Sequence, residues 1–108
     1  MDDTKTGGNN GPQRYIVLMR LTDKGLAELS ASANRRKVSE DRVAALGGKS
    51  IAFYAVMGGY DFVQVFEMPG NEEMMRYVLT ARRDGHVDPL ILPAFDADTY
   101  TQIVSKIQ

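Results

Sequence analysis

The carboxylate of greatest chemical interest is that of Asp61, which follows Gly58-Gly59 and Tyr60 at the start of a β-rich segment. Carboxylates are depleted in strands, so an acid here calls for an explanation. One interpretation is structural: a short acid after two glycines accepts backbone N–H groups and fixes a hairpin. The other is acid–base chemistry or contact with a ligand. For Tyr60 the alternatives are cross-strand aromatic packing and a hydroxyl offered to a ligand.

The single histidine, His86, lies in the segment Asp84-Gly85-His86-Val87-Asp88. Asp84, His86 and Asp88 offer nitrogen and oxygen ligands to a metal ion, and a lone imidazole in a barrel mouth is a candidate general base. Polar residues are, however, expected in a loop that follows a helix. We therefore interpret the segment as a solvated turn and predict no metal site.

The common catalytic signatures are missing from the sequence. There is no cysteine, and there is no serine elbow, phosphate-cradling glycine motif or zinc-binding helix motif. The sequence therefore assigns no catalytic residue and indicates no cofactor.

Three polar residues stand within otherwise apolar β-rich segments: Arg20, Tyr54 and Gln64. Buried polar groups need hydrogen-bond partners, so these side chains pair with one another, with a second subunit or with a ligand. If they converge, they would supply the few orienting groups of an apolar small-molecule pocket. A satisfied core remains the alternative.

Composition excludes several classes of partner. Thirteen Lys and Arg against fourteen Asp and Glu give a net charge of −1, which argues against a dedicated nucleic-acid or anionic-membrane binder. Residues 35–37 are basic but are followed by Glu40 and Asp41, which is typical of a solvated helix face. No apolar run approaches the ~18 residues of a membrane span, and no signal peptide is evident, so a cytoplasmic location is expected.

The chain is expected to form one domain at residues 14–108, preceded by a disordered tail at residues 1–13 that has little to bury. Hydrophobic periodicity predicts four strands and three helices in that domain. The strands are expected at 14–21, 49–57, 60–68 and 90–95, and the helices at 22–46, 71–83 and 98–107.

Local signals refine these elements. Thr22 and Asp23 are candidate N-caps, a bend or break is expected within the polar residues 34–39, and Gly47-Gly48 ends the first helix as a residue with positive φ does. Gly58-Gly59 predicts a two-residue hairpin, and Asn71 is a candidate cap for the second helix. Apolar stripes are expected on the three helices at Leu26, Leu29, Ala33, Val43 and Leu46, at Met74, Tyr77, Val78 and Ala81, and at Tyr100, Ile103, Val104 and Ile107.

The β-α-β-β-α-β order predicts an α+β fold, the ferredoxin-like split βαβ arrangement with an additional C-terminal helix. Pro93 cannot donate to a ladder, so the last strand is expected to be at an edge or bulged. Both faces of the sheet are apolar, because Tyr15, Val17 and Met19 alternate with Ile16 and Leu18. A bare sheet would expose a larger apolar patch than monomers of this size tolerate, so we expect a homodimer.

The segments Leu46-Gly47-Gly48-Lys49 and Gly59-Tyr60-Asp61, followed by the β-rich residues 63–68 and a final Ala94-Phe95, resemble the GYD-domain family from about residue 15 to residue 107. The resemblance implies a dimeric α/β barrel, in which two ferredoxin-like sheets pack face to face. It carries over no catalytic residue.

Two functional hypotheses follow from these observations. The first is a small homo-oligomeric module that assembles or holds a small, partly apolar ligand between its sheets. The alternative is a cofactor-free enzyme of the oxygenase or isomerase type that uses Asp61 or His86 for proton transfer. One scaffold hosts many chemistries, so the fold alone does not decide between them.

Overall fold

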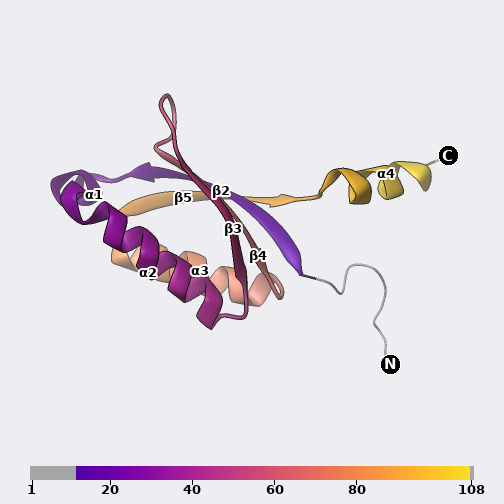
Figure 1. The fold of residues 1–108 in the computed structure, drawn as a ribbon, viewed down its shortest axis with the longest axis horizontal. Helices are drawn as coiled ribbons and strands as arrows, with labels where there is room; N and C mark the ends of the chain where they lie inside the picture. The colour runs from indigo at the N-terminus through magenta and orange to yellow at the C-terminus, as the bar shows by residue number, and fades with distance from the viewer. Residues whose placement is uncertain (1–11, 108) are drawn as a thin grey trace.

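The computed structural model describes residues 12–107 (Figure 1). The predicted tail at residues 1–13 therefore lies outside the described residues, apart from Pro12 and Gln13, and Gln13 is already part of the first strand.

Four strands form one antiparallel sheet in the order β3-β4-β2-β5. With the helices between them, this is the predicted ferredoxin-like order, which confirms the α+β fold class. The elements are β2 (Gln13–Leu21), α1 (Asp23–Ala27), the 3-10 turn η2 (Leu29–Ala31), α2 (Ser32–Ala45), β3 (Lys49–Ala55), β4 (Phe62–Met68), α3 (Asn71–Asp84), β5 (Val87–Ala94) and α4 (Ala97–Ser105).

The first helical segment breaks earlier than predicted. Thr22 caps α1 as expected, since its hydroxyl accepts from the N–H of Gly25, but α1 ends at Ala27. The expected bend within residues 34–39 was wrong, because α2 runs through them without a break. The ion pair between Arg36 and Glu40, four residues apart, supports the helix there.

The apolar stripe predicted for this segment is only partly correct. Val43 is fully buried and Leu46 is half-buried, whereas Leu26, Leu29 and Ala33 are exposed. Because η2 interrupts the helix, residues of α1 and residues of α2 do not share one continuous helical face. Gly47 ends the segment with a φ of +85°, as predicted.

The hairpin between β3 and β4 has a wider turn than the two glycines suggested. The strands stop at Ala55 and start again at Phe62, and the N–H of Val56 donates to the carbonyl of Asp61. Gly58 takes a φ of +115°, which explains the need for glycine there. Tyr60 and Asp61 therefore lie in the turn and not in a strand.

The helix α3 matches its predicted stripe, because Met74, Tyr77, Val78 and Ala81 are all buried. The predicted cap was wrong: Gly70 is the N-cap, and Asn71 begins the helix. The carboxamide of Asn71 instead accepts a hydrogen bond from the Tyr15 hydroxyl.

The core lies between the sheet and the helices α2 and α3, which cover one face (Figure 1). The opposite face of the sheet, here called the open face, is not covered by any described helix. β5 is an edge strand, as Pro93 predicted. Beyond it α4 projects away from α2 and α3, and its apolar residues Tyr100, Ile103, Val104 and Ile107 are exposed.

Candidate functional site

Arg20 and Tyr60 meet at the β3–β4 turn. The Arg20 Nε donates to the carbonyl of Gly59 at 2.6 Å, and its guanidinium lies 4.6 Å from the centroid of the Tyr60 ring. A guanidinium over an aromatic face is attracted by the ring quadrupole. These contacts hold the turn against β2, which is a structural use of both side chains.

Asp61 binds the backbone of β2. Its Oδ2 accepts from the N–H of Leu21 at 2.7 Å, and its own N–H donates to the carbonyl of Met19 at 2.9 Å. A carboxylate that accepts a backbone N–H continues strand pairing where the ladder ends. The contacts of Asp61 are those of its structural interpretation.

The other two polar strand residues lie on opposite faces of the sheet. Tyr54 pairs with Val63 on the open face and is 61% exposed. Gln64, the next residue of β4, points to the helix-covered face and is 1% exposed. Since neighbouring strand residues alternate between faces, Arg20 and Tyr54 share one side and Gln64 lies on the other. The three side chains do not converge.

A pocket of about 180 Å³ lies on the helix-covered side, between the sheet and the helices α2 and α3. Its apolar wall includes Met19, Phe53 and Phe62, and the rings of Phe53 and Phe62 are 5.4 Å apart. The pocket is therefore within a single chain, on the opposite side of the sheet from the predicted site between two sheets.

Polar groups enter this pocket from both layers. The carboxamide of Gln64 comes from the sheet, and its Nε2 is buried with no hydrogen-bond partner among the residues that the structure describes. From the helices come Tyr77 and Ser39, whose hydroxyl oxygens are 2.7 Å apart. Burial raises the pKa of the Tyr77 hydroxyl above its ordinary value, so Tyr77 is a neutral group in the pocket wall.

Three arginines of α2 also line the pocket. Arg36 pairs with Glu40 and lies 5.3 Å from the centroid of the Phe53 ring, and Arg42 pairs with Asp84 at 3.1 Å. Arg35 is half-buried and not fully solvated as predicted. One carboxylate, that of Asp84, stands among the described lining residues, so the arginines outnumber the acids there.

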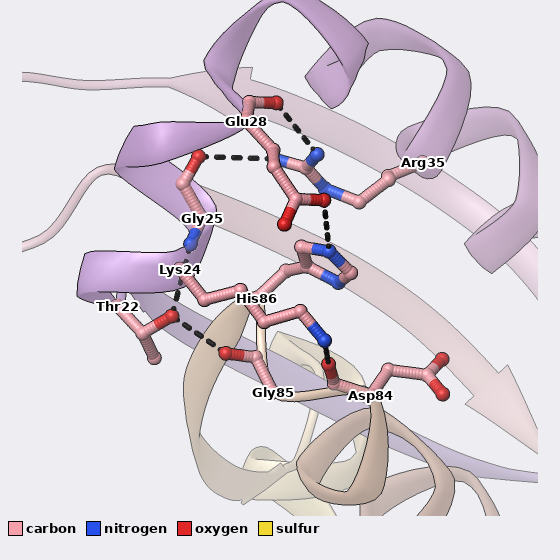
Figure 2. Close-up of polar contacts among 8 residues, drawn as sticks. All are labelled: Thr22, Lys24, Gly25, Glu28, Arg35, Asp84, Gly85 and His86. Carbon is pink, nitrogen blue, oxygen red and sulfur yellow. Dashed lines mark hydrogen bonds and ion pairs between the residues drawn. The ribbon is translucent and has the colours of Figure 1, made fainter.

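His86 borders the pocket at the start of β5, within a polar cluster that joins β5 to α1 (Figure 2). Its Nε2 lies 3.0 Å from Oε1 of Glu28. That hydrogen bond is the main cause that lowers the pKa of the Glu28 carboxyl below its ordinary value. Arg35 donates to the backbone carbonyls of Glu28 and Gly25 at 2.8 and 3.4 Å, which caps the end of α1.

The rest of the cluster is built on the turn before β5 (Figure 2). The Thr22 hydroxyl donates to the carbonyl of Gly85 at 2.6 Å, and Lys24 Nζ donates to the carbonyl of Asp84 at 2.9 Å. A Cβ at Gly25 would lie 2.1 Å from the His86 carbonyl oxygen, so only glycine permits this approach. His86 is thus part of a docked turn, and the solvated interpretation was too simple.

The candidate metal ligands are not gathered around one point. The carboxylate of Asp84 pairs with Arg42 and the imidazole of His86 with Glu28, while Asp88 is exposed. Within residues 12–107, no group of three or more His, Asp or Glu side chains is arranged to hold a metal ion.

The sequence did not single out Ser39, Arg42, Tyr77 or Phe53 as site residues. Tyr77 carried a signal, because a phenol in an otherwise aliphatic helix stripe needs a partner for its hydroxyl. Ser39 and Arg42 are one turn apart on α2, and only the packing of α2 on the sheet places them beside Gln64.

No described helix is both long enough and apolar enough to cross a membrane.

Comparison with known proteins adds a family and a relative. Residues 15–104 match the GYD domain. A protein of Thermus thermophilus, described as "Glutamine synthetase and cystathionine beta-lyase binding protein", is 35% identical over 81 residues. That match covers 74% of this chain and 85% of the relative. The chain therefore belongs to the GYD domain family.

Proposed function

We propose that this chain is a protein-binding module that acts as a homodimer, with two copies joined through their open sheet faces. The observation that carries the proposal is the open face itself. Ile16, Leu18, Val63 and Val65 line its centre, and Leu90 on β5 is 44% exposed. Apolar patches of this kind on small proteins mark sites of association.

A second copy is the occupant that fits this surface best. The middle of the face is apolar, and the charged residues Arg20 and Asp88 lie opposite one another at one end. A two-fold axis through its centre would place apolar residues on apolar residues in both copies. The pattern also explains why alternate residues of β2 are apolar on both sides, although only one side packs on the helices.

The helix α4 supports the same arrangement. It has nine residues, it leaves the edge strand β5, and Asp96 caps it by accepting from the N–H of Thr99 at 2.8 Å. Helices this short are marginal in water unless an apolar side packs on something. A second copy would cover Tyr100 and Ile103, which are exposed in the single chain.

The class of external partner is suggested by the Thermus thermophilus relative, whose description names two enzymes that it binds. We extend that description to this chain: its partner is an enzyme such as glutamine synthetase or cystathionine beta-lyase. A dimer presents every binding surface twice, so a multivalent partner gains avidity from it.

The alternative of a cofactor-free oxygenase or isomerase requires a free acid or base near a cavity. Asp61 accepts from Leu21, and His86 pairs with Glu28. Both candidate groups are thus engaged by their own chain, and these contacts support binding as the function in preference to proton transfer.

The test compares two leucine-to-glutamate substitutions at sites of similar exposure. Leu90→Glu lies on the open face, where the side chain of Leu90 is 44% exposed. Leu79→Glu lies on the outer side of α3, where the side chain of Leu79 is 56% exposed. A dimer buries two glutamates in the first variant, so its dissociation constant should rise at least ~100-fold. The second variant should keep the mass of the dimer.

The enzyme partner is tested with purified glutamine synthetase and cystathionine beta-lyase from the source organism, immobilised in turn. The unmodified chain should bind at least one of them saturably, and Leu90→Glu should bind it more weakly because avidity is lost. If neither enzyme binds the unmodified chain, the protein-binding proposal is wrong. If Leu90→Glu stays a dimer, the proposed interface is wrong.

A further inference from the structure

The pocket on the helix-covered side contains a donor that nothing in the described part of the chain uses. Gln64 is 1% exposed, and its Nε2 has no partner among the described residues. Buried polar groups are nearly always hydrogen-bonded, and an unsatisfied one is costly. Gln64 also lines the cavity, so a ligand bound there could supply the missing acceptor.

The shape and wall of the pocket limit what that ligand can be. Its volume is about 180 Å³, somewhat larger than the ~150 Å³ cavities that hold benzene. Phe53 and Phe62 form an apolar wall beside Gln64. The occupant is therefore a compact molecule with an apolar body and a hydrogen-bond acceptor for Gln64.

The charged residues around the pocket indicate the charge that the polar end of the ligand should carry. Arg35, Arg36 and Arg42 line it; Arg36 pairs with Glu40, and Arg42 pairs with Asp84, the one carboxylate among the described lining residues. Arg35 donates to backbone carbonyls, so its charge is not neutralised by those contacts. Arginine in a partly apolar site favours a carboxylate, which accepts paired hydrogen bonds from a guanidinium.

We propose that this pocket is a binding site for a small monocarboxylate with an apolar body about the size of a benzene ring. The apolar part lies against Phe53 and Phe62, and the carboxylate accepts from Gln64 and from the arginines of α2. The site is complete within one chain and lies on the opposite side of the sheet from the open face. The inference is thus independent of the proposed homodimer and of its enzyme partner.

Three probes of one size test the proposal: benzoate, the neutral benzamide and the cationic benzylamine. Each is titrated into the purified full-length chain, and the side-chain amide signals of Gln64 are followed by NMR. Benzoate should shift those signals saturably with a Kd that is millimolar or tighter, benzamide should bind more weakly, and benzylamine should leave them unchanged.

Two variants locate the effect. Gln64→Leu removes the donor and nearly keeps the volume, so benzoate affinity, followed for this variant through the backbone amide signals of the pocket residues, should fall about tenfold while the chain stays folded. Arg36→Gln should weaken benzoate but not benzamide, and its matched control, Arg83→Gln at the exposed end of α3, should change neither affinity. If Gln64→Leu fails to fold, the comparison of Arg36→Gln with Arg83→Gln still tests the proposal.

Three results would overturn the proposal. The first is that benzoate leaves the Gln64 amide signals unchanged at millimolar concentration. The second is that benzylamine binds as well as benzoate, which would deny the role of the arginines. The third is that Arg36→Gln and Arg83→Gln reduce benzoate affinity equally. Enzyme binding and dimer mass are measured separately, so either proposal can fail without the other.

Discussion

The two faces of the sheet carry side chains of similar apolar character but have different surroundings. Tyr15, Val17 and Phe66 face the helices and are buried, whereas Ile16 and Leu18, which alternate with them on β2, face outward and are only partly covered. The polar groups differ too: Gln64 is enclosed on the first face, and Tyr54 is exposed on the second. The comparison separates a face that carries a small pocket under two helices from a face that no described helix covers.

The largest expected effect comes from removing a core side chain on the covered face. Phe66 is fully buried and packs edge-to-face on Tyr77, with ring centroids 5.0 Å apart. Phe66→Ala should lower the free energy of unfolding by about 3–5 kcal/mol. Leu92→Ala on the open face should cost about 1 kcal/mol or less in dilute protein. Denaturant titration measures both, and equal costs would abolish the contrast between the faces.

A smaller effect is expected where β2 meets the hairpin turn. Asp61→Ala leaves the Leu21 N–H without its acceptor and should cost about 1–3 kcal/mol of unfolding free energy. Asp61→Asn keeps an oxygen in place and should cost less than about 1 kcal/mol. Thermal and chemical unfolding of the two variants test this order. Equal losses would show that the charge of Asp61, and not its acceptor, matters.

Alkaline pH should weaken the covered layer through Tyr77. Burial raises the pKa of its hydroxyl above the ordinary value of 10.0. Above pH 10 the unfolded chain therefore ionises this tyrosine while the folded chain retains the proton, so stability falls as pH rises. Tyr77→Phe should reduce that slope, although it also removes the hydrogen bond to Ser39. An unchanged slope would contradict the buried, neutral state of Tyr77.

The smallest expected effect lies at the exposed pair between α1 and β5. The hydrogen bond from His86 holds the pKa of Glu28 below its ordinary value of 4.5, so the stabilisation is present above that pH and is lost on acidification. Glu28→Gln should flatten the acid limb of stability slightly, because solvent screens an exposed pair. Urea unfolding midpoints of the unmodified chain and of Glu28→Gln between about pH 3 and pH 6 measure how stability falls with acidification. A steeper fall in Glu28→Gln than in the unmodified chain would contradict the prediction.

Sequence patterns predicted the elements that depend on local periodicity. The stripe of Met74, Tyr77, Val78 and Ala81 follows from helical spacing, and the positive φ of Gly47 follows from its position after a helix. The order of strands and helices then indicated the fold, because few topologies accommodate that order.

Features that depend on long-range packing were not predictable in this way. The close approach of Gly25 in α1 to the His86 carbonyl joins residues far apart in the chain, so no local pattern indicates it. Strand alternation within β4 places Gln64 with Phe66, but its relation to Tyr54 depends on the register between β3 and β4, which includes a bulge at Ile51. Prediction of the pocket would in addition require the angle at which α2 packs on the sheet.

Sedimentation velocity of the unmodified chain over a wide range of concentrations tests the central claim, that a second copy covers the open face. We expect a species of twice the 12.0 kDa chain mass at micromolar concentration, which dissociates on dilution. A species of 12.0 kDa at every concentration would contradict the account, because the open face would then be bare in solution.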